Sequence, residues 1–264
     1  MQYLYMFVLF TGLAFAVRGM AAIRWSDGVL QSVRTNLALG LAHHLIYPYA
    51  VFVIVGAGQA VLRGTVVPHV SVHAWDHVPF VLAALAYALA HDFLDYWTHR
   101  LLHQRGFWDI HAVHHSDTDM NWTTTYRVHL IEPLMMQASY LLIAIFTGLP
   151  PLGAAAGFVV FTLYNAFVHL DLDIHFGPFT RVLATPRFHR WHHADTPDAY
   201  NTNFANIFAF WDVLFGTYRV PGAYKGPLGF EGTPGHNLPK LLVWPFLQWS
   251  KALPRFRRPA AANS

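Results

Sequence analysis

Five apolar stretches, separated by short polar segments, limit how this chain can fold. They cover residues 4–17, 37–62, 78–97, 134–149 and 152–170. A helix that spans a bilayer needs about 20 apolar residues. The second, third and fifth stretches are long enough, while the first and fourth are short enough to be tilted or re-entrant. We therefore expect an all-α fold, a multi-pass membrane bundle of helices.

The composition also favours a membrane protein. Only 12% of the residues are charged and the mean hydropathy is +0.31, whereas soluble domains contain about 25% charged residues. The chain has no cysteine, which excludes disulfides, thiolate ligands and iron–sulfur clusters. The formal charge of +3 is small and the basic residues form no stripe, so we expect no nucleic-acid partner.

The positions of Lys and Arg predict the orientation of the bundle, because short loops rich in these residues stay in the cytoplasm. With alternating helices, one face carries Arg18, Arg24, Arg34, Arg100, Arg105, Arg127 and the basic residues of 181–258. Only Arg63 falls on the other face. The first stretch lacks a preceding basic residue and a clear cleavage site, so we interpret it as a retained helix rather than a signal peptide.

We expect three parts along the chain. Residues 1–77 form N-terminal transmembrane helices, residues 78–220 a catalytic domain, and residues 221–264 an interfacial tail. From residue 171 onward the sequence is richer in Gly, Pro, Asn and Trp, which indicates a cytoplasmic helical cap of short helices and turns. Residues 241–249 are apolar and precede Lys251, Arg255, Arg257 and Arg258, a pattern typical of an interfacial helix.

Histidines concentrate in three short strings, HRLLH, HAVHH and HRWHH. Imidazole is the commonest metal ligand, and residues three or four apart share a helix face. We therefore expect each of the two later strings to present its three histidines to a common point from one short helix. An isolated histidine at the end of the fifth stretch is at a suitable depth to join them. The candidate ligands are His99, His103, His111, His114, His115, His169, His189, His192 and His193.

So many nitrogens exceed what one first-row metal takes, so the sequence predicts a histidine-rich dimetal site. Neutral imidazoles leave the metal charge uncompensated, and ligand histidines usually donate their second N–H to a nearby group. We therefore expect carboxylates beside the rings. The candidates are Asp92, Asp95, Asp109, Asp117, Asp119, Glu132, Asp171, Asp173, Asp195 and Asp212.

The other histidines receive simpler interpretations. We expect His43 and His44 to be packing or capping residues. Surface positions are expected for His69, His73, His77 and His236. For His91, His129 and His175, the sequence leaves open whether they bind metal, support a ligand or serve the structure.

Four strings together resemble the fatty acid hydroxylase and sterol desaturase superfamily. They are DFLDYWTHRLLH at residues 92–103, HAVHHS at 111–116, PRFHRWHH at 186–193 and WDVLFGTY at 211–218. Arg127, His129 and Glu132 resemble the family's Arg-x-His-Pro-x-Glu segment, with Leu130 in place of the usual proline. The likeness covers about residues 78–220.

The resemblance implies a helical membrane bundle whose cytoplasmic cap holds two iron ions, with zinc able to occupy the same ligands in purified protein. It implies an enzyme that takes O₂ as co-substrate and inserts oxygen into a C–H bond of a lipid, either a fatty acyl chain, a sterol or an isoprenoid. Residue by residue, it carries the ligand role to the nine candidate histidines. Hydroxylation, desaturation and ether-lipid cleavage all remain open.

Two readings from other classes compete with an oxygenase. A zinc-dependent membrane hydrolase would use an HExxH helix, which this chain lacks. A metal carrier would place ligands along several spans rather than at one membrane surface. The chain shows neither a haem-binding donor domain nor a nicotinamide fingerprint, so an oxygenase would require a separate electron-donor protein.

Overall fold

The computed structural model describes residues 2–18, 26–63, 75–136, 151–230 and 232–252. Within these ranges every regular element is a helix, and the one β-type pairing is an isolated bridge between Ala194 and Leu228. The all-α prediction is therefore confirmed for the described part of the chain.

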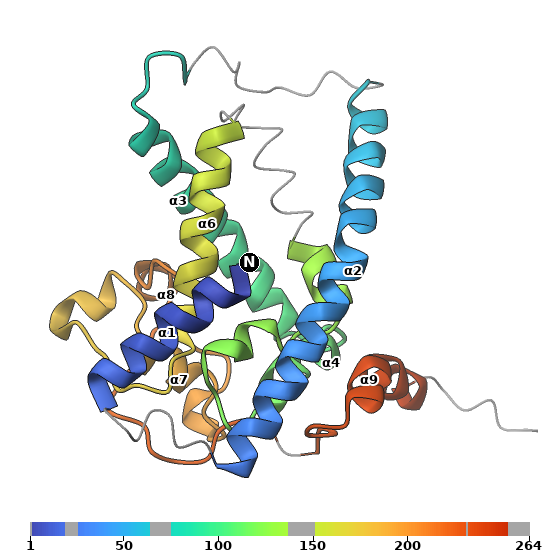
Figure 1. Ribbon diagram of the computed structural model, residues 1–264, viewed down its shortest axis with the longest axis vertical. Helices are drawn as coiled ribbons and strands as arrows, with labels where there is room; N and C mark the ends of the chain where they lie inside the picture. Colours follow the sequence, from blue (N-terminus) through green and yellow to red (C-terminus); the bar gives the residue numbers. More distant parts are fainter. Residues whose placement is uncertain (1, 19–25, 64–74, 137–150, 231, 253–264) are drawn as a thin grey trace, which may run out of the picture.

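The apolar stretches form four long helices (Figure 1): α1 (Gln2–Arg18), α2 (Asp27–Arg63), α3 (Phe80–Leu102) and α6 (Pro151–Val168). They correspond to the first, second, third and fifth stretches. For the fourth stretch, residues 131–136 are helical and residues 137–150 lie outside the described ranges.

Helices α3 and α6 pack against each other along their length (Figure 1). A Cβ atom at Gly157 would lie 2.5 Å from Cδ1 of Tyr87 and 3.0 Å from the carbonyl oxygen of Ala84. Any larger residue at Gly157 would push the two helices apart. The contact lies in the N-terminal halves of α3 and α6, whereas His99 lies near the C-terminal end of α3 and His169 directly follows α6. These C-terminal ends are the lower ends of both helices in Figure 1.

Short helices and turns surround these lower ends and form a cap, which we define as residues 103–136 and 169–230. Its elements are α4 (Trp108–His111), η3 (His114–Ser116), η4 (Trp122–Tyr126), η5 (Gly177–Arg181), α7 (Pro186–His192), η6 (Pro197–Ala199) and α8 (Phe210–Leu214). Such short elements have little stability of their own, so tertiary contacts must hold them.

One apolar cluster joins the cap to the long helices. Tyr96 of α3, Val168 of α6, Phe188 of α7 and the cap residue Phe204 are almost fully buried against one another. Burial of apolar surface on this scale is the main stabilising contribution to such a junction. The helices that carry the first and third histidine strings, α3 and α7, therefore share one core with the end of α6.

The last described helix is α9 (Leu238–Ala252), which confirms a helix over the apolar segment near the C-terminus. Leu241 is buried against Leu39 and Val113, whereas Val243, Phe246 and Leu247 are exposed. The three arginines expected to anchor this helix, at positions 255, 257 and 258, lie outside the described residues.

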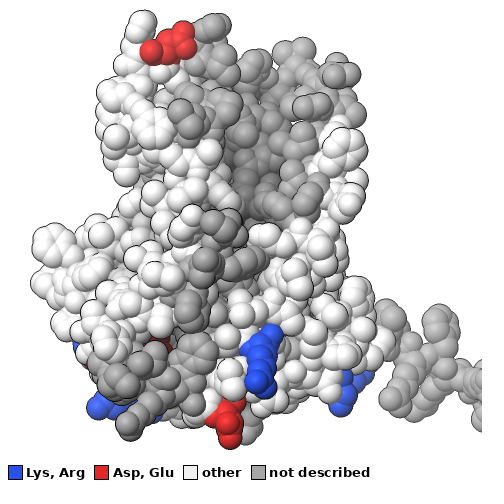
Figure 2. All heavy atoms as spheres, in the orientation of Figure 1, with Lys and Arg blue, Asp and Glu red and all other residues white. Residues whose placement is uncertain are grey.

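Large apolar side chains are exposed on all four long helices. Examples are Val8 on α1, Phe52 on α2, Leu85 on α3 and Val159 on α6, each more than half exposed. Charged side chains gather instead at the lower end of the face in Figure 2, apart from an acidic group at the upper tip. Within the described ranges, no helix meets the length and hydropathy required of a bilayer-spanning segment. The expected spans therefore stay a prediction.

Candidate metal centre

The nine candidate histidines converge in the cap as two groups. The five-histidine group consists of His99, His103, His111, His115 and His192, and the four-histidine group of His114, His169, His189 and His193. Within each group, one ring nitrogen from every member lies within 4.8 Å of the others. Each group therefore has a shape that could hold one metal ion.

The histidine strings do not each serve a common point, so that prediction was wrong. His111 and His115 enter the five-histidine group while His114, between them, enters the other; His192 likewise separates from His189 and His193. The second string is also broken into α4 and η3 rather than forming one helix. Adjacent residues on a helix point about 100° apart, whereas residues four apart share a face. A string with a pair four apart and one further histidine therefore reaches two centres.

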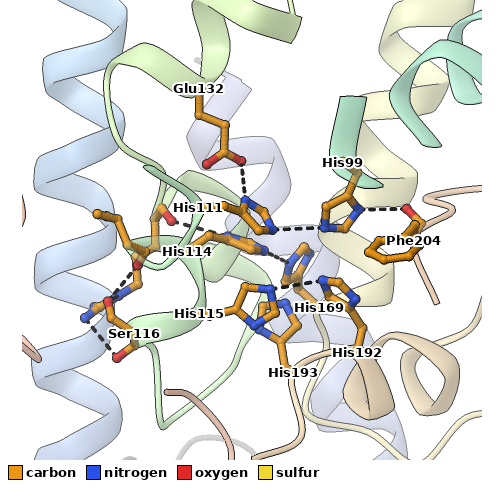
Figure 3. A network of polar contacts seen from close by, with 12 residues as sticks. His99, His111, His114, His115, Ser116, Glu132, His169, His192, His193 and Phe204 are labelled. Atoms are coloured by element: carbon orange, nitrogen blue, oxygen red, sulfur yellow. Dashed lines mark hydrogen bonds and ion pairs between the residues drawn. The ribbon is translucent and has the colours of Figure 1, made fainter. Parts of the chain in front are cut away.

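Hydrogen bonds at Nδ1 fix the orientation of five rings, and Figure 3 shows those of His99 and His111. The rings of His99, His114, His169 and His192 donate Nδ1–H to the backbone carbonyl oxygens of Phe204, Arg127, Asn165 and Thr202, at 2.7, 3.2, 2.7 and 2.8 Å. His111 donates Nδ1–H to Oε1 of Glu132 at 3.0 Å. A neutral imidazole carries one proton, so Nε2 of each ring is left with a lone pair.

These lone pairs face one another. The Nε2 atoms of His99 and His111 are 3.0 Å apart, and those of His114 and His169 are 3.2 Å apart. In neither pair is a proton available for a hydrogen bond, because both Nδ1 atoms already carry one. A cation between the two nitrogens would turn this repulsive arrangement into a favourable one, so the residues fit a metal ion.

Burial keeps the cap histidines neutral. It lowers the pKa of His111, His114 and His192 well below the ordinary value. Loss of solvation is the largest cause in every case, followed by the neighbouring imidazoles. Protonated rings therefore do not explain the close nitrogen contacts, and metal ligation requires the neutral form that burial favours.

The nitrogen spacing also bears on coordination geometry. Two ligands at about 2.1 Å from one ion lie about 3.0 Å apart at a right angle and about 3.4 Å apart at a tetrahedral angle. The closest Nε2 pairs within the two groups are 2.9 to 3.2 Å apart. This spacing is nearer to right-angled coordination with more than four positions than to a tetrahedral site.

Of the ten carboxylates expected beside the rings, Glu132 is the one that contacts a candidate ligand within the described ranges. Burial, and then the charge of Asp95, raises the pKa of Glu132. The others have different roles: Asp171 and Asp173 pair with Arg190 and Arg187 on the surface. The prediction of a carboxylate shell was therefore largely wrong, because backbone carbonyls occupy the positions expected for carboxylates.

Two of these carboxylates act on the backbone that supports the rings. Asp212 accepts hydrogen bonds from the amides of Phe204 and Ala205 at 2.8 and 2.9 Å. Asp92 accepts from the amides of Ile207 and Phe208 at 2.7 and 2.8 Å. Together they fix the loop whose Phe204 carbonyl orients His99. The sequence did not predict the carbonyl partners of the rings, because every residue type has a backbone carbonyl.

Arg127 connects the four-histidine group to distant parts of the chain. Its carbonyl orients His114, while its buried guanidinium donates to Ser116 Oγ at 2.8 Å and to the carbonyl of Gly235. It also reaches Asn36 of α2, whose amide donates to Asp117 at 2.9 Å. The motif arginine thus acts as a structural bridge.

Two cavities reach the histidines. The first, of about 70 Å³, borders both groups: His99 and His111 of the five-histidine group and His114, His169 and His189 of the four-histidine group line it. The second, of about 190 Å³, borders His103, His115 and His192 of the five-histidine group, together with Trp108 and Phe230. The five-histidine group therefore adjoins both cavities.

The histidines left open by the sequence lie outside both groups. His91 stacks on Phe161 with ring centroids 3.9 Å apart. The Nε2 of His129 donates to the carbonyl of Leu242, and His175 is exposed and accepts from the amide of Gly177. His236 contacts the Arg127 guanidinium rather than lying free on the surface.

Comparison with known proteins adds an independent observation. The sequence profile of the fatty acid hydroxylase family matches residues 84–217, just over half of the chain. The chain is 32% identical over 156 residues to the ornithine lipid hydroxylase of Rhizobium tropici, covering 56% of this chain and 46% of that protein.

Similar likeness is found to animal enzymes. The alkylglycerol monooxygenase of Homo sapiens is 32% identical over 130 residues, or 49% of this chain and 29% of that protein. Methylsterol monooxygenase 1 of Gallus gallus is 32% identical over 162 residues, which cover 58% of this chain and 53% of that protein. The chain thus spans about half or less of the length of these three relatives. No solved structure matches the chain.

Proposed function

Because this chain belongs to the fatty acid hydroxylase family, we propose that it is a lipid oxygenase that holds two iron ions between its nine candidate histidines. It would use O₂ and external electrons to hydroxylate a C–H bond of a membrane lipid. The named relatives act on an ornithine lipid, an alkylglycerol and a methylsterol, which supports a lipid substrate. Desaturation and ether cleavage are the alternatives at the same site.

The facing lone pairs of His99 with His111 and of His114 with His169 carry this proposal. Nitrogen ligands suit iron, copper and zinc. Right-angled spacing and groups of five and four histidines favour iron over the tetrahedral site that zinc prefers. We assign all nine histidines as ligands on this basis.

Bound iron would supply the oxygen and electron-transfer chemistry that the side chains of the chain lack. The chain itself would orient the histidine rings and shield the metal ions from bulk water. Carbonyl oxygens and Glu132 hold five rings with Nε2 directed at the centres. Eight of the nine histidines are buried, so bulk water has little access. The first cavity leaves space where a lipid carbon could lie beside both groups.

We also propose that the long helices lie in the bilayer with the cap at its cytoplasmic surface. Exposed apolar side chains on α1, α2, α3 and α6 support this placement, because patches of this extent mark membrane or protein contacts. The basic residues of the cap, such as Arg105 and Arg187, would then follow the positive-inside rule. The parts 1–77, 78–220 and 221–264 would be membrane anchor, catalytic domain and interfacial tail.

Labelled oxygen tests the proposed activity directly. Membranes from cells that express the chain are incubated with ¹⁸O₂ and a reducing system, and their lipids are profiled by mass spectrometry. We expect ¹⁸O in a lipid hydroxyl, which should be absent with the matched variant His115→Ala. A new double bond without label would identify a desaturase, and unchanged lipids in both samples would contradict an oxygenase.

Metal analysis separates the classes of function. After anaerobic preparation, about two irons per chain are expected for the oxygenase. One tightly bound zinc would favour a hydrolase, and loosely exchangeable metal would favour a carrier.

A further inference from the structure

The first cavity has a polar wall as well as its histidines. Asp95, Glu132 and Asn206 line it beside members of both histidine groups. At about 70 Å³ the cavity has room for a small group of atoms, since one water molecule occupies about 30 Å³ of liquid. Whatever enters it lies next to the proposed metal centres and these three polar side chains.

Each of the three side chains brings an oxygen that has no partner among the described residues. Oε2 of Glu132 and Oδ1 of Asn206 are buried without a hydrogen bond. The Asp95 side chain is only 7% exposed and makes no hydrogen bond or ion pair within the described ranges. None of these oxygens is used to hold a histidine ring.

The orientations of two of the groups are fixed by their other atoms. Oε1 of Glu132 accepts from His111, so Oε2 is the oxygen of this cavity-lining residue that is left without a partner. Nδ2 of Asn206 donates to the carbonyl of Phe161 at 3.4 Å, so Oδ1 is the amide atom left without a partner. Bound metal cations favour the ionised form of a nearby carboxyl group, so in the metal-loaded protein the wall presents hydrogen-bond acceptors.

Water can satisfy these acceptors while the cavity is free of lipid. A ligand that displaces ordered water loses affinity unless it reproduces the hydrogen bonds of that water. A plain hydrocarbon segment would leave three buried acceptors unpaired, which is unfavourable. A group with an O–H or N–H would replace the water without that cost.

We propose that the lipid substrate carries a hydroxyl or N–H group within a few bonds of the carbon to be oxidised, and that Asp95, Glu132 and Asn206 receive its hydrogen bonds. The inference rests on the proposed function and narrows its substrate class. Lipids oxidised far from any polar group, such as the middle of an alkyl chain, are disfavoured by this wall. Asp95 is the specificity-determining residue we assign, because it has no other described partner.

Matched probe pairs test the assignment by binding rather than turnover. Iron-loaded protein in detergent is titrated anaerobically with hexadecane-1,2-diol and with 1,2-dimethoxyhexadecane, which differ in the hydrogen-bond donor alone. N-methylpalmitamide and N,N-dimethylpalmitamide form a second pair that distinguishes N–H from O–H. We expect at least one donor probe to bind about tenfold or more tightly than its blocked partner, as sites built to bond a hydroxyl discriminate strongly.

Variants of the cavity residues test whether their side chains cause the preference for donor probes. Asp95→Leu and Asn206→Leu should each reduce it to less than about threefold, by removing an acceptor. Asp95→Asn keeps one acceptor oxygen and should retain part of the preference for the donor probe. A merely structural role would not give such a graded result. Asp173→Asn, which alters a surface carboxylate paired with Arg187, is the matched control. Iron content and thermal stability identify any variant that fails to fold.

Equal binding of both members in both pairs, including no binding of either, would overturn the inference. A preference that survives both leucine variants would do the same. The ¹⁸O₂ experiment remains separate. Labelled lipid without donor preference would leave the oxygenase standing and reject this substrate class, whereas donor preference without label would reject the oxygenase.

Discussion

The five-histidine and four-histidine groups lie side by side in the cap but are held in different ways. In the first group, His99 and His192 are oriented by backbone carbonyls and His111 by the Glu132 carboxylate. In the second, carbonyls orient His114 and His169, while the buried Nδ1 atoms of His189 and His193 have no partner among the described residues.

This difference indicates unequal metal centres. A partner at the second ring nitrogen fixes the tautomer and makes the ligand more basic, and a carboxylate does so more strongly than a carbonyl. The five-histidine group also adjoins both cavities, whereas the four-histidine group adjoins the first. We therefore expect the five-histidine group to bind its ion more tightly and to be the more accessible centre.

Removing one ligand from each group should have the largest effect and tests whether the groups are separate. We expect His99→Ala and His189→Ala each to lose one equivalent of iron and more than 100-fold of activity, beyond the 10- to 100-fold that loss of an outer partner costs. Iron is measured by mass spectrometry after anaerobic loading, with the exposed His175→Ala as control. Loss of both ions from either variant would show one cooperative site and break the comparison.

Changing Glu132 should weaken only the five-histidine group. Glu132→Gln removes the charge that supports His111 but keeps an acceptor, and Glu132→Ala removes both. We expect the affinity of that group for Fe²⁺ to fall about 10- to 100-fold in the alanine variant and less in the glutamine variant. The Fe²⁺ affinity of each histidine group is measured separately by competition with a chelator. Equal weakening of both groups would contradict a dedicated role for Glu132.

The smallest expected effect comes from Asp212, which acts through the backbone of Phe204. Asp212→Asn replaces one acceptor by an amide NH₂, so the affinity of the five-histidine group should fall by up to about tenfold. Burial raises the pKa of Asp212 to about 6. Its carboxylate gains a proton below that pH, so the advantage of the wild type should be present near pH 7.5 and shrink as the pH falls through 6. Chelator competition at several pH values measures the ratio of the Fe²⁺ affinities of the wild type and the variant. A ratio that does not change with pH would show that the ionised carboxylate of Asp212 does not support the Phe204 backbone.

Much of the candidate site could be predicted from the sequence because histidine is a chemically distinctive residue. The strings around His99, His111 and His189 identify nitrogen ligands at spacings that a helix converts into shared faces. The same logic predicted helices over four of the apolar stretches. Residues 137–150, most of the fourth stretch, and the arginines near the C-terminus lie outside the described residues, so a fourth long helix and a cationic anchor stay predictions.

The assignment of each histidine to the five-histidine or the four-histidine group could not be predicted. Which of two adjacent rings, such as His192 and His193, joins which group depends on where α7 lies relative to α3 and α6. The same holds for the carbonyl partners, because every residue has a carbonyl and the conformation of the backbone selects the few that face a ring.

The sequence by itself determined that this chain is helical, rich in apolar segments, and equipped with nine histidines suited to metal ligation. Only the tertiary structure decided that the rings form groups of five and four, that Glu132 alone of the expected carboxylates supports a described ring, and that Asp95 faces the cavity between the groups. The physical reason is that local spacing fixes directions within one helix. Relations between rings from α3, α6, α7 and the cap arise from packing contacts between residues far apart in the chain.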